Sequence, residues 1–237
     1  MAVAAAALGD SLVRMTTTAP AAAEQLADVR DMFVVHRSFR REFTLIPQLI
    51  RRVAPGDTAR AAVVARHARL ILRGLDLHHT GEDDLLWPKL LERAAPSADL
   101  IHRMEAQHHR VEQLIAELGQ ALPRWEAEAR PAVSEEVAST FDALRDALLE
   151  HLDDEERHIL PIAERHITQK EWEGLGEHGM HKVKAAELPI LFGAVLEEAT
   201  PDERTMMLRV VPPPVRLLVR TVFAWQYRRY VKKVRGV

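Results

Sequence analysis

The chain has 237 residues, of which 47% are hydrophobic and 28% charged, and its formal net charge is −3. Such a chain is long enough to bury one sizeable core and to carry an extension. It has no Cys, which excludes disulfides, thiolate ligands and Cys-ligated iron–sulfur clusters. The small net charge excludes a chain that binds polyanions over its whole surface, so no nucleic acid partner is expected. Any metal must be bound by nitrogen and oxygen.

The first 20 residues are rich in Ala and Thr and contain no basic residue before Arg14. A secretory signal needs a positively charged start, so this segment does not qualify. No apolar stretch reaches the ~20 residues that a membrane span requires. We therefore expect residues 1–20 to form a disordered leader and the protein to be cytoplasmic.

Two long helices are predicted next. The first runs from about residue 21 to residue 53 and stops at residues 54–57, where Pro and Gly interrupt the chain. The second begins at Asp57 or Thr58, either of which can cap it, and ends near residues 93–96. Apolar residues recur along both at the helical period, which predicts amphipathic helices that face a common core.

A second pair of helices follows. The third helix begins near Ser97 and weakens around Leu122 and Pro123. The fourth follows Pro131, with Ser134 as its expected cap, and continues to about residues 159–161. Helices of ~30 residues are ~45 Å long. The short connections predict antiparallel neighbours, as in an up-down-up-down bundle.

The predicted fold is therefore all-α, with a four-helix bundle in residues 21–167 and a helical C-terminal extension in residues 168–237. Capping-box patterns at Thr168–Glu171 and Thr200–Glu203 predict short helices in the extension. After residues 212–214, all Pro, comes a basic amphipathic helix without any acid. We expect its apolar face to pack on its own domain; the alternative is weak contact with an acidic membrane surface.

A short motif rich in His and acidic residues occurs twice. His78 and Glu82 stand four residues apart, and His151 and Glu155 repeat that spacing 73 residues later. On a helix, residues four apart are neighbours on one face, with ~5–6 Å between their Cβ atoms. Each pair can therefore bind one metal ion or share a pair of ions.

A single His precedes each pair. His36 lies 42 residues before His78, and His108 lies 43 residues before His151. This order predicts two similar helical hairpins that face each other around one site. Imidazoles and carboxylates suit iron, manganese or zinc. Burial of so many ionisable groups without partners is costly, and metal ligation removes that cost. The candidate metal ligands are His36, His78, Glu82, His108, His151 and Glu155.

Four polar residues lie one position round from the candidate ligands: His79, His109, Asp83 and Glu156. We expect these residues to support the ligands from behind or to lie on the surface. A carboxylate in such a position can accept the free N–H of a ligating imidazole.

A different di-iron arrangement is found in ferritin-like proteins, which use Glu-x-x-His on two helices and one Glu from each of the other two. The residues that match this pattern are Glu105, His108, Glu155, His158, Glu42 and Glu82. That set leaves His36, His78 and His151 unexplained on buried helix faces. We therefore favour the first set of ligands.

The ordered motifs resemble the hemerythrin-like, or HHE cation-binding, family over about residues 25–165. The residues that carry the resemblance are His36, His78-x3-Glu82 with Trp87-Pro88, His108, and His151-x3-Glu155 with Leu160-Pro161. The segment from Glu171-Trp172 is similar to extensions of actinobacterial members. The resemblance implies a non-haem di-iron centre with Glu82 and Glu155 as bridging carboxylates. It also assigns the imidazoles in pairs, His36 with His78 on one iron and His108 with His151 on the other.

The chain departs from the oxygen-carrying members at Met104, where they have a further His one turn before the position of His108. His109, Glu105 and His67 are the candidates to replace it. A missing ligand leaves a labile position, which favours peroxide or nitric oxide chemistry over oxygen carriage. We expect a protein that binds or reduces a small ligand such as O2, peroxide or nitric oxide, and the sequence leaves open whether it is an enzyme. The alternatives are a metal-dependent sensor without turnover and a metal-free structural bundle.

Overall fold

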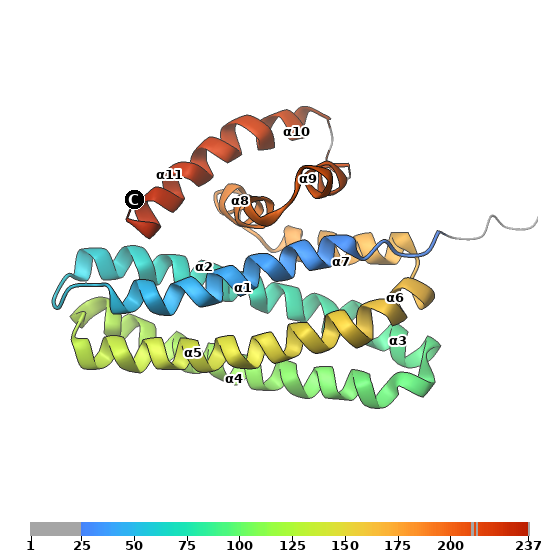
Figure 1. Ribbon diagram of the computed structural model, residues 1–237, viewed down its shortest axis with the longest axis horizontal. Coiled ribbons are helices and arrows are strands. Elements are labelled where there is room, and N and C mark those ends of the chain that lie inside the picture. The colour runs from blue at the N-terminus through green and yellow to red at the C-terminus, as the bar shows by residue number, and fades with distance from the viewer. Residues whose placement is uncertain (1–24, 210, 212, 237) are drawn as a thin grey trace, which may run out of the picture.

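The computed structural model describes residues 25–209, 211 and 213–236, so the predicted leader in residues 1–20 lies outside the described residues. The described chain is helical, and its only paired extended residues form one isolated bridge, between Leu26 and Thr168. The all-α prediction is confirmed. Four long helices lie side by side, and successive helices run in opposite directions (Figure 1). The long helices are α1 (Arg30–Arg51), α2 (Thr58–Leu85), α4 (Ala98–Glu128) and α5 (Pro131–Asp154).

Shorter helical segments complete the bundle and form the extension. In the bundle they are α3 (Trp87–Arg93), a 3₁₀ turn (Ala95–Ser97), a π-helical segment (Glu155–Ile159) and α6 (Leu160–His166). In the extension they are α7 (Gln169–His181), α8 (Leu188–Glu198), α9 (Pro201–Met207), α10 (Pro213–Leu218), a second π-helical segment (Val219–Phe223) and α11 (Ala224–Arg235). None of the described helices is long and apolar enough to cross a bilayer.

The first helix begins nine residues later than predicted, at Arg30. The described residues just before it are drawn into backbone pairing with a distant segment instead. Ala27 N donates to Ile167 O at 3.0 Å, and Gln169 N donates to Gln25 O at 2.7 Å. Because these amide and carbonyl groups are already paired, residues 25–29 are not part of the helix.

Proline explains two differences on the second and fourth helices. The predicted second helix is interrupted at Leu86, and the predicted fourth helix changes to a π turn at Glu155. Pro88 and Pro161 follow these breaks, and a Pro inside a helix cannot donate to the carbonyl four residues earlier. Single π turns of this kind often lie at functional sites. The break and the π turn both adjoin a His-x3-Glu motif.

Two further sequence predictions about helix ends are wrong. The third helix continues past Pro123 to Glu128, since Leu122 and Trp125 on either side of it are buried in the core. Ser134 does not cap the fourth helix, which begins at Pro131. The Ser134 hydroxyl instead accepts a hydrogen bond from Trp125 Nε1 at 2.9 Å. Both capping boxes of the extension are present, at Thr168 and Thr200.

The core of the bundle has two apolar clusters. One is centred on Phe43, Phe141 and Trp125, and the other contains Trp87 and Met104. On every long helix the candidate metal ligands fall between members of these two clusters in the sequence. The polar site is therefore a layer across the bundle with apolar packing on both sides.

The extension covers one side of the bundle (Figure 1). Helix α7 packs on α2, α8 and α9 pack on α1, and α11 packs on α8 and α2. Arg41 of α1 donates to Glu198 Oε1 at 2.7 Å and to Ala194 O at 2.9 Å, which anchors α8. The predicted docking of the last helix on its own domain is confirmed only in part. Helix α11 packs on α8 and α2, but much of the apolar face that we expected to dock is exposed, at Leu217, Leu218, Val222 and Trp225.

Candidate metal centre

One group of possible ligands comes from α1, α2 and the start of the π turn. It consists of His36, His78, Glu82 and Glu155, whose potential ligand atoms all lie within 4.8 Å of one another. His36 Nε2 is 3.3 Å from Glu155 Oε2, and His78 Nε2 is 3.3 Å from Glu82 Oε1. Two imidazoles and two carboxylates therefore converge from helices that are far apart in the sequence.

A second group adjoins the first and shares Glu82 with it. It consists of His79, Glu82, His108 and His151, again with ligand atoms within 4.8 Å of one another. Glu82 Oε2 is 3.4 Å from His108 Nε2, and His108 Nε2 is 3.2 Å from His151 Nε2. The two oxygens of Glu82 thus face different groups. Glu155 likewise reaches the second group, since its Oε2 is 3.7 Å from His151 Nε2.

Most of the atoms that face the centre lack hydrogen-bond partners. They include both oxygens of Glu82 and of Glu155, and Nε2 of His36 and His78. Both ring nitrogens of His79 are also buried without a partner. Buried polar atoms are almost always hydrogen-bonded. A cluster of buried polar atoms without hydrogen-bond partners therefore needs an explanation. This donor set, all nitrogen and oxygen, fits metal ions of the iron, manganese and zinc type.

Three imidazoles are oriented from behind by hydrogen bonds at Nδ1. His36 Nδ1 is 2.9 Å from Glu156 Oε1, and His108 Nδ1 is 2.7 Å from Asp83 Oδ1. Protons at Nδ1 leave Nε2 as the lone-pair atom toward the centre, and such partners raise the basicity of a ligand. The expectation that these two carboxylates accept imidazole N–H groups agrees with the distances.

The two carboxylates and His151 are supported in turn. Arg40 donates to Glu156 Oε1 at 2.6 Å, and Trp87 Nε1 donates to Asp83 Oδ1 at 2.8 Å. Trp87 therefore orients the Asp83 carboxylate in addition to packing in the apolar core. His151 Nδ1 lies 3.3 Å from Gln107 Oε1, which fixes the third imidazole by a neutral partner.

Burial and charge divide the imidazoles into two classes. Burial lowers the pKa of His36, but the nearby Glu155 carboxylate and the hydrogen bond to Glu156 raise it overall, to about 9. Burial also opposes the charge on His108, but its bond to Asp83 raises its pKa to about 9. For His78 and His151 burial dominates and lowers the pKa to about 3.

The two carboxylates form a coupled buried pair. Burial and the repulsion of Glu155 raise the pKa of Glu82 above its ordinary value. Burial would also raise the pKa of Glu155, but the charge on His36 and their contact lower it. Without a cation the pair therefore favours a single negative charge, on Glu155, and a bound cation would allow both carboxylates to ionise.

His79 is where the structure differs most from the sequence prediction. We expected it to support the ligands or to lie on the surface, but it is buried in the second group, with its ring stacked on that of His108 at 4.0 Å between centroids. The signal was present in the sequence. Glu82 lies four residues after His78 and three after His79, and both spacings place neighbours on one helix face.

His79 is also a candidate to replace the His that is absent at position 104. Met104 is fully buried in apolar packing, and His79 provides a third imidazole to the group that contains His108. The three replacements considered from the sequence lie elsewhere. His109 is 81% exposed, Glu105 pairs with His102, and His67 contacts Glu42 and Tyr230.

The ferritin-like set does not assemble. Glu105 is half exposed, and His158 Nδ1 contacts the backbone oxygen of Asp154. Glu42 is occupied by Arg41 and His67, away from both groups. All six residues of the favoured set, by contrast, lie in the two groups, together with His79.

Comparison with known families places this geometry in context. The chain matches the hemerythrin HHE cation binding domain over residues 27–163, a range that contains both groups of possible ligands. Comparison with curated proteins and with solved structures gives no match. Since the matched range covers more than half of the chain, the protein belongs to the hemerythrin HHE cation-binding family.

Proposed function

We propose that the protein is a non-haem di-iron protein that binds or reduces a small oxygen- or nitrogen-derived ligand such as O2, peroxide or nitric oxide. The observation that carries this proposal is the shared carboxylate Glu82. Its two buried oxygens lack hydrogen-bond partners and face separate groups of imidazoles. A carboxylate in that position suits two ions better than one.

The iron would supply coordination positions for the small ligand and electrons for its reduction. The residues of the chain supply the surroundings. Asp83 and Glu156 keep His108 and His36 oriented, with Nε2 directed inward. The apolar layers on both sides of the site exclude bulk water, which strengthens every electrostatic interaction inside it. One ion would be bound by His79, His108 and His151 of the second group, and the other by His36 and His78 of the first.

This unequal division indicates where a small ligand would bind. With Glu82 and Glu155 both shared between two ions, the ion beside His36 and His78 would have one protein ligand fewer than the other, so one more position there would remain for a ligand from outside. The first group also has the more exposed imidazole, because the side chain of His78 is 12% exposed whereas that of His108 in the other group is 2% exposed and that of His151 is fully buried. We therefore assign ligand access to the His78 side. This reverses the sequence-based expectation that the open position lies beside Met104.

Metal content and turnover test the proposal in sequence. Protein purified aerobically should contain about two irons per chain and show near-ultraviolet charge-transfer bands, as an oxo-bridged pair does. One zinc and no iron would contradict the proposal. Peroxide consumption by the iron-loaded protein then separates a catalyst from a sensor, since a sensor would retain the iron and the spectrum without turnover.

A further inference from the structure

The last helical stretch of the chain has two very different faces. We call residues 213–236 the C-terminal arm. One face is fixed to the rest of the extension, since Tyr227 and Arg235 both donate to Glu197, at 2.5 and 2.8 Å. Gly193 of α8 allows this close packing, because a Cβ there would lie 2.3 Å from the Tyr227 ring. The opposite face of the arm is consequently directed away from α8.

That opposite face is unusually apolar. Of six large hydrophobic side chains exposed among the described residues, five belong to the arm, and the most exposed are Leu217 at 66% and Trp225 at 51%. Leu218, Val222 and Trp225 follow at spacings of four and three residues, which places them on one helix face. We call these three residues the apolar stripe. Contiguous exposed apolar surface of this kind marks an interaction site.

The arm is also strongly cationic. It contains seven Arg and Lys residues and no Asp or Glu. Arg229 stacks on the Trp225 ring at 4.9 Å from its centroid, so positive charge borders the apolar stripe directly. Exposed cations without an acidic partner among the described residues are Arg220, Arg228, Arg229, Lys232 and Lys233. An apolar stripe flanked by cations is the pattern of a helix that lies in the surface of a membrane with anionic lipids.

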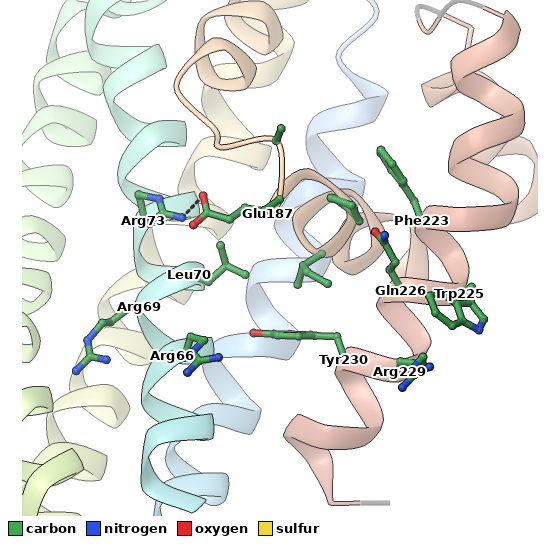
Figure 2. Close-up of a pocket in the computed structure, with 14 residues that line it drawn as sticks. Arg66, Arg69, Leu70, Arg73, Glu187, Phe223, Trp225, Gln226, Arg229 and Tyr230 are labelled. Carbon is green, nitrogen blue, oxygen red and sulfur yellow. Dashed lines mark ion pairs between the residues drawn. The ribbon is translucent and has the colours of Figure 1, made fainter. Parts of the chain in front are cut away.

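A cavity of about 780 Å³ lies between the arm, α8 and α2. Figure 2 shows Arg66, Arg69 and Arg73 along α2 on one side of it, and aromatic side chains of the arm on the other. Arg73 pairs with Glu187 and Arg69 with Glu126. Arg66 has no acidic partner among the described residues. The cavity therefore has an excess of positive charge beside an apolar wall, which suits a phosphate with attached apolar chains.

We propose that the C-terminal arm binds the surface of a membrane that contains anionic phospholipid. The apolar stripe lies among the acyl chains near the headgroups, the exposed cations contact lipid phosphates, and the arginine-lined cavity receives one headgroup phosphate. Trp225 and Arg229 line the cavity, and Trp225 also belongs to the stripe, so the two features form one continuous surface. The apolar stripe favours a lipid surface over nucleic acid as the partner, because a nucleic-acid-binding surface needs cations but no exposed apolar face. The proposal does not depend on the iron centre.

The four Trp residues provide a native probe. Trp87, Trp125 and Trp172 are buried, and only Trp225 is exposed. Full-length protein mixed with vesicles of phosphatidylglycerol and phosphatidylcholine should sediment with them, and brominated lipid should quench the Trp225 fluorescence. Vesicles of phosphatidylcholine alone should bind at least about ten-fold more weakly. Equal binding to both, or unchanged Trp fluorescence, would overturn the proposal.

Two variants separate the stripe from the cavity. Leu218→Ser with Trp225→Ser should weaken vesicle binding by about ten-fold or more, since it removes two apolar side chains from the membrane interface. Arg66→Gln should weaken it by about five-fold, the contribution of one cation near an anionic surface. The matched control is Arg110→Gln on α4, which removes one exposed charge on a helix that packs mainly on α5 and α2 and should change nothing.

Three outcomes would overturn the assignment. Wild-type binding by the stripe variant would exclude the arm as the membrane contact, provided that circular dichroism shows an intact fold. Equal losses in Arg66→Gln and Arg110→Gln would exclude the cavity as the headgroup site. Release from vesicles by inorganic phosphate or by a short DNA duplex, at concentrations that leave the ionic strength unchanged, would show that the arm binds phosphate in general and not a lipid surface.

Discussion

In both copies of the repeated His-x3-Glu motif, an acidic residue accepts a hydrogen bond from the single His of the other hairpin. In the first copy, Asp83 follows the Glu and accepts from His108 of the other hairpin. In the second copy, Glu156 occupies the matching position and accepts from His36 of the first hairpin. The pKa values repeat this symmetry, since His36 and His108 are both raised to about 9. Each hairpin therefore supports the single His of the other.

The copies differ at the position after the first His. The first copy has His79 there, buried among the possible ligands, whereas the second has Leu152, buried in the apolar core. The second copy also contains the π turn at Glu155, and the first has no such turn. A sequence repeat thus predicts the shared framework of the site, while single substitutions within the repeat decide how many possible ligands each side contributes.

The largest effect is expected where the two groups join. Glu82→Ala removes the only residue that belongs to both groups, so iron should fall from about two per chain to near zero. Glu82→Gln keeps the size of the side chain and serves as the steric control, with a similarly large loss because the negative charge is absent. Elemental analysis after anaerobic reconstitution measures the effect. Full iron content in either variant would show that Glu82 does not bridge two iron ions.

The next effect tests the asymmetry between the copies. His79→Ala should lower the iron affinity of one position by more than the ~10–100-fold typical of a residue that only supports a ligand. The iron content should then be about one per chain. The mirrored control is Leu152→Met, a volume-conserving change that should cost less than about 1.5 kcal/mol of stability and leave both irons. Two irons in His79→Ala would show that His79 is not a ligand.

A smaller and symmetrical effect is expected at the supporting carboxylates. Asp83→Asn and Glu156→Gln should each weaken iron binding by ~10–100-fold, because each removes the charge behind one imidazole. The two losses should be similar, as the matching hydrogen bonds predict. Anaerobic titration against a competing chelator measures both. A loss confined to one variant would show that the pseudo-symmetry does not extend to metal binding.

The smallest effect concerns protons. In the metal-free protein at pH 7, the imidazoles of His36 and His108 are doubly protonated and positively charged, because their pKa is raised to about 9. A ligating imidazole must be neutral, so each has to lose one proton when iron binds. Iron binding should therefore release protons, and the apparent affinity should rise as the pH increases toward 9. Calorimetry in two buffers of different ionisation enthalpy counts these protons. Affinity that is independent of pH between 6 and 9 would contradict the assignment of these two residues.

Much of this architecture could be predicted from the sequence, because helical periodicity and the spacing of His and Glu are local signals. The six favoured ligands required only that four helices face a common centre. The sequence did not place His79 among the possible ligands because its helix face is ambiguous, and only tertiary packing decides whether the residue beside a possible ligand turns inward. The start of α1 at Arg30 was missed for a similar reason, since the backbone pairing with residues 167–169 comes from a distant part of the chain.

The most direct test of the account is a crystal structure of the iron-loaded protein with diffraction data on both sides of the iron absorption edge. We predict two anomalous peaks in each chain. One should lie beside His36 and His78, the other should lie within bonding distance of His79, and Glu82 should contact both. A single peak, or two peaks with His79 outside bonding distance of either, would contradict the central claim that an asymmetric repeat binds a pair of iron ions.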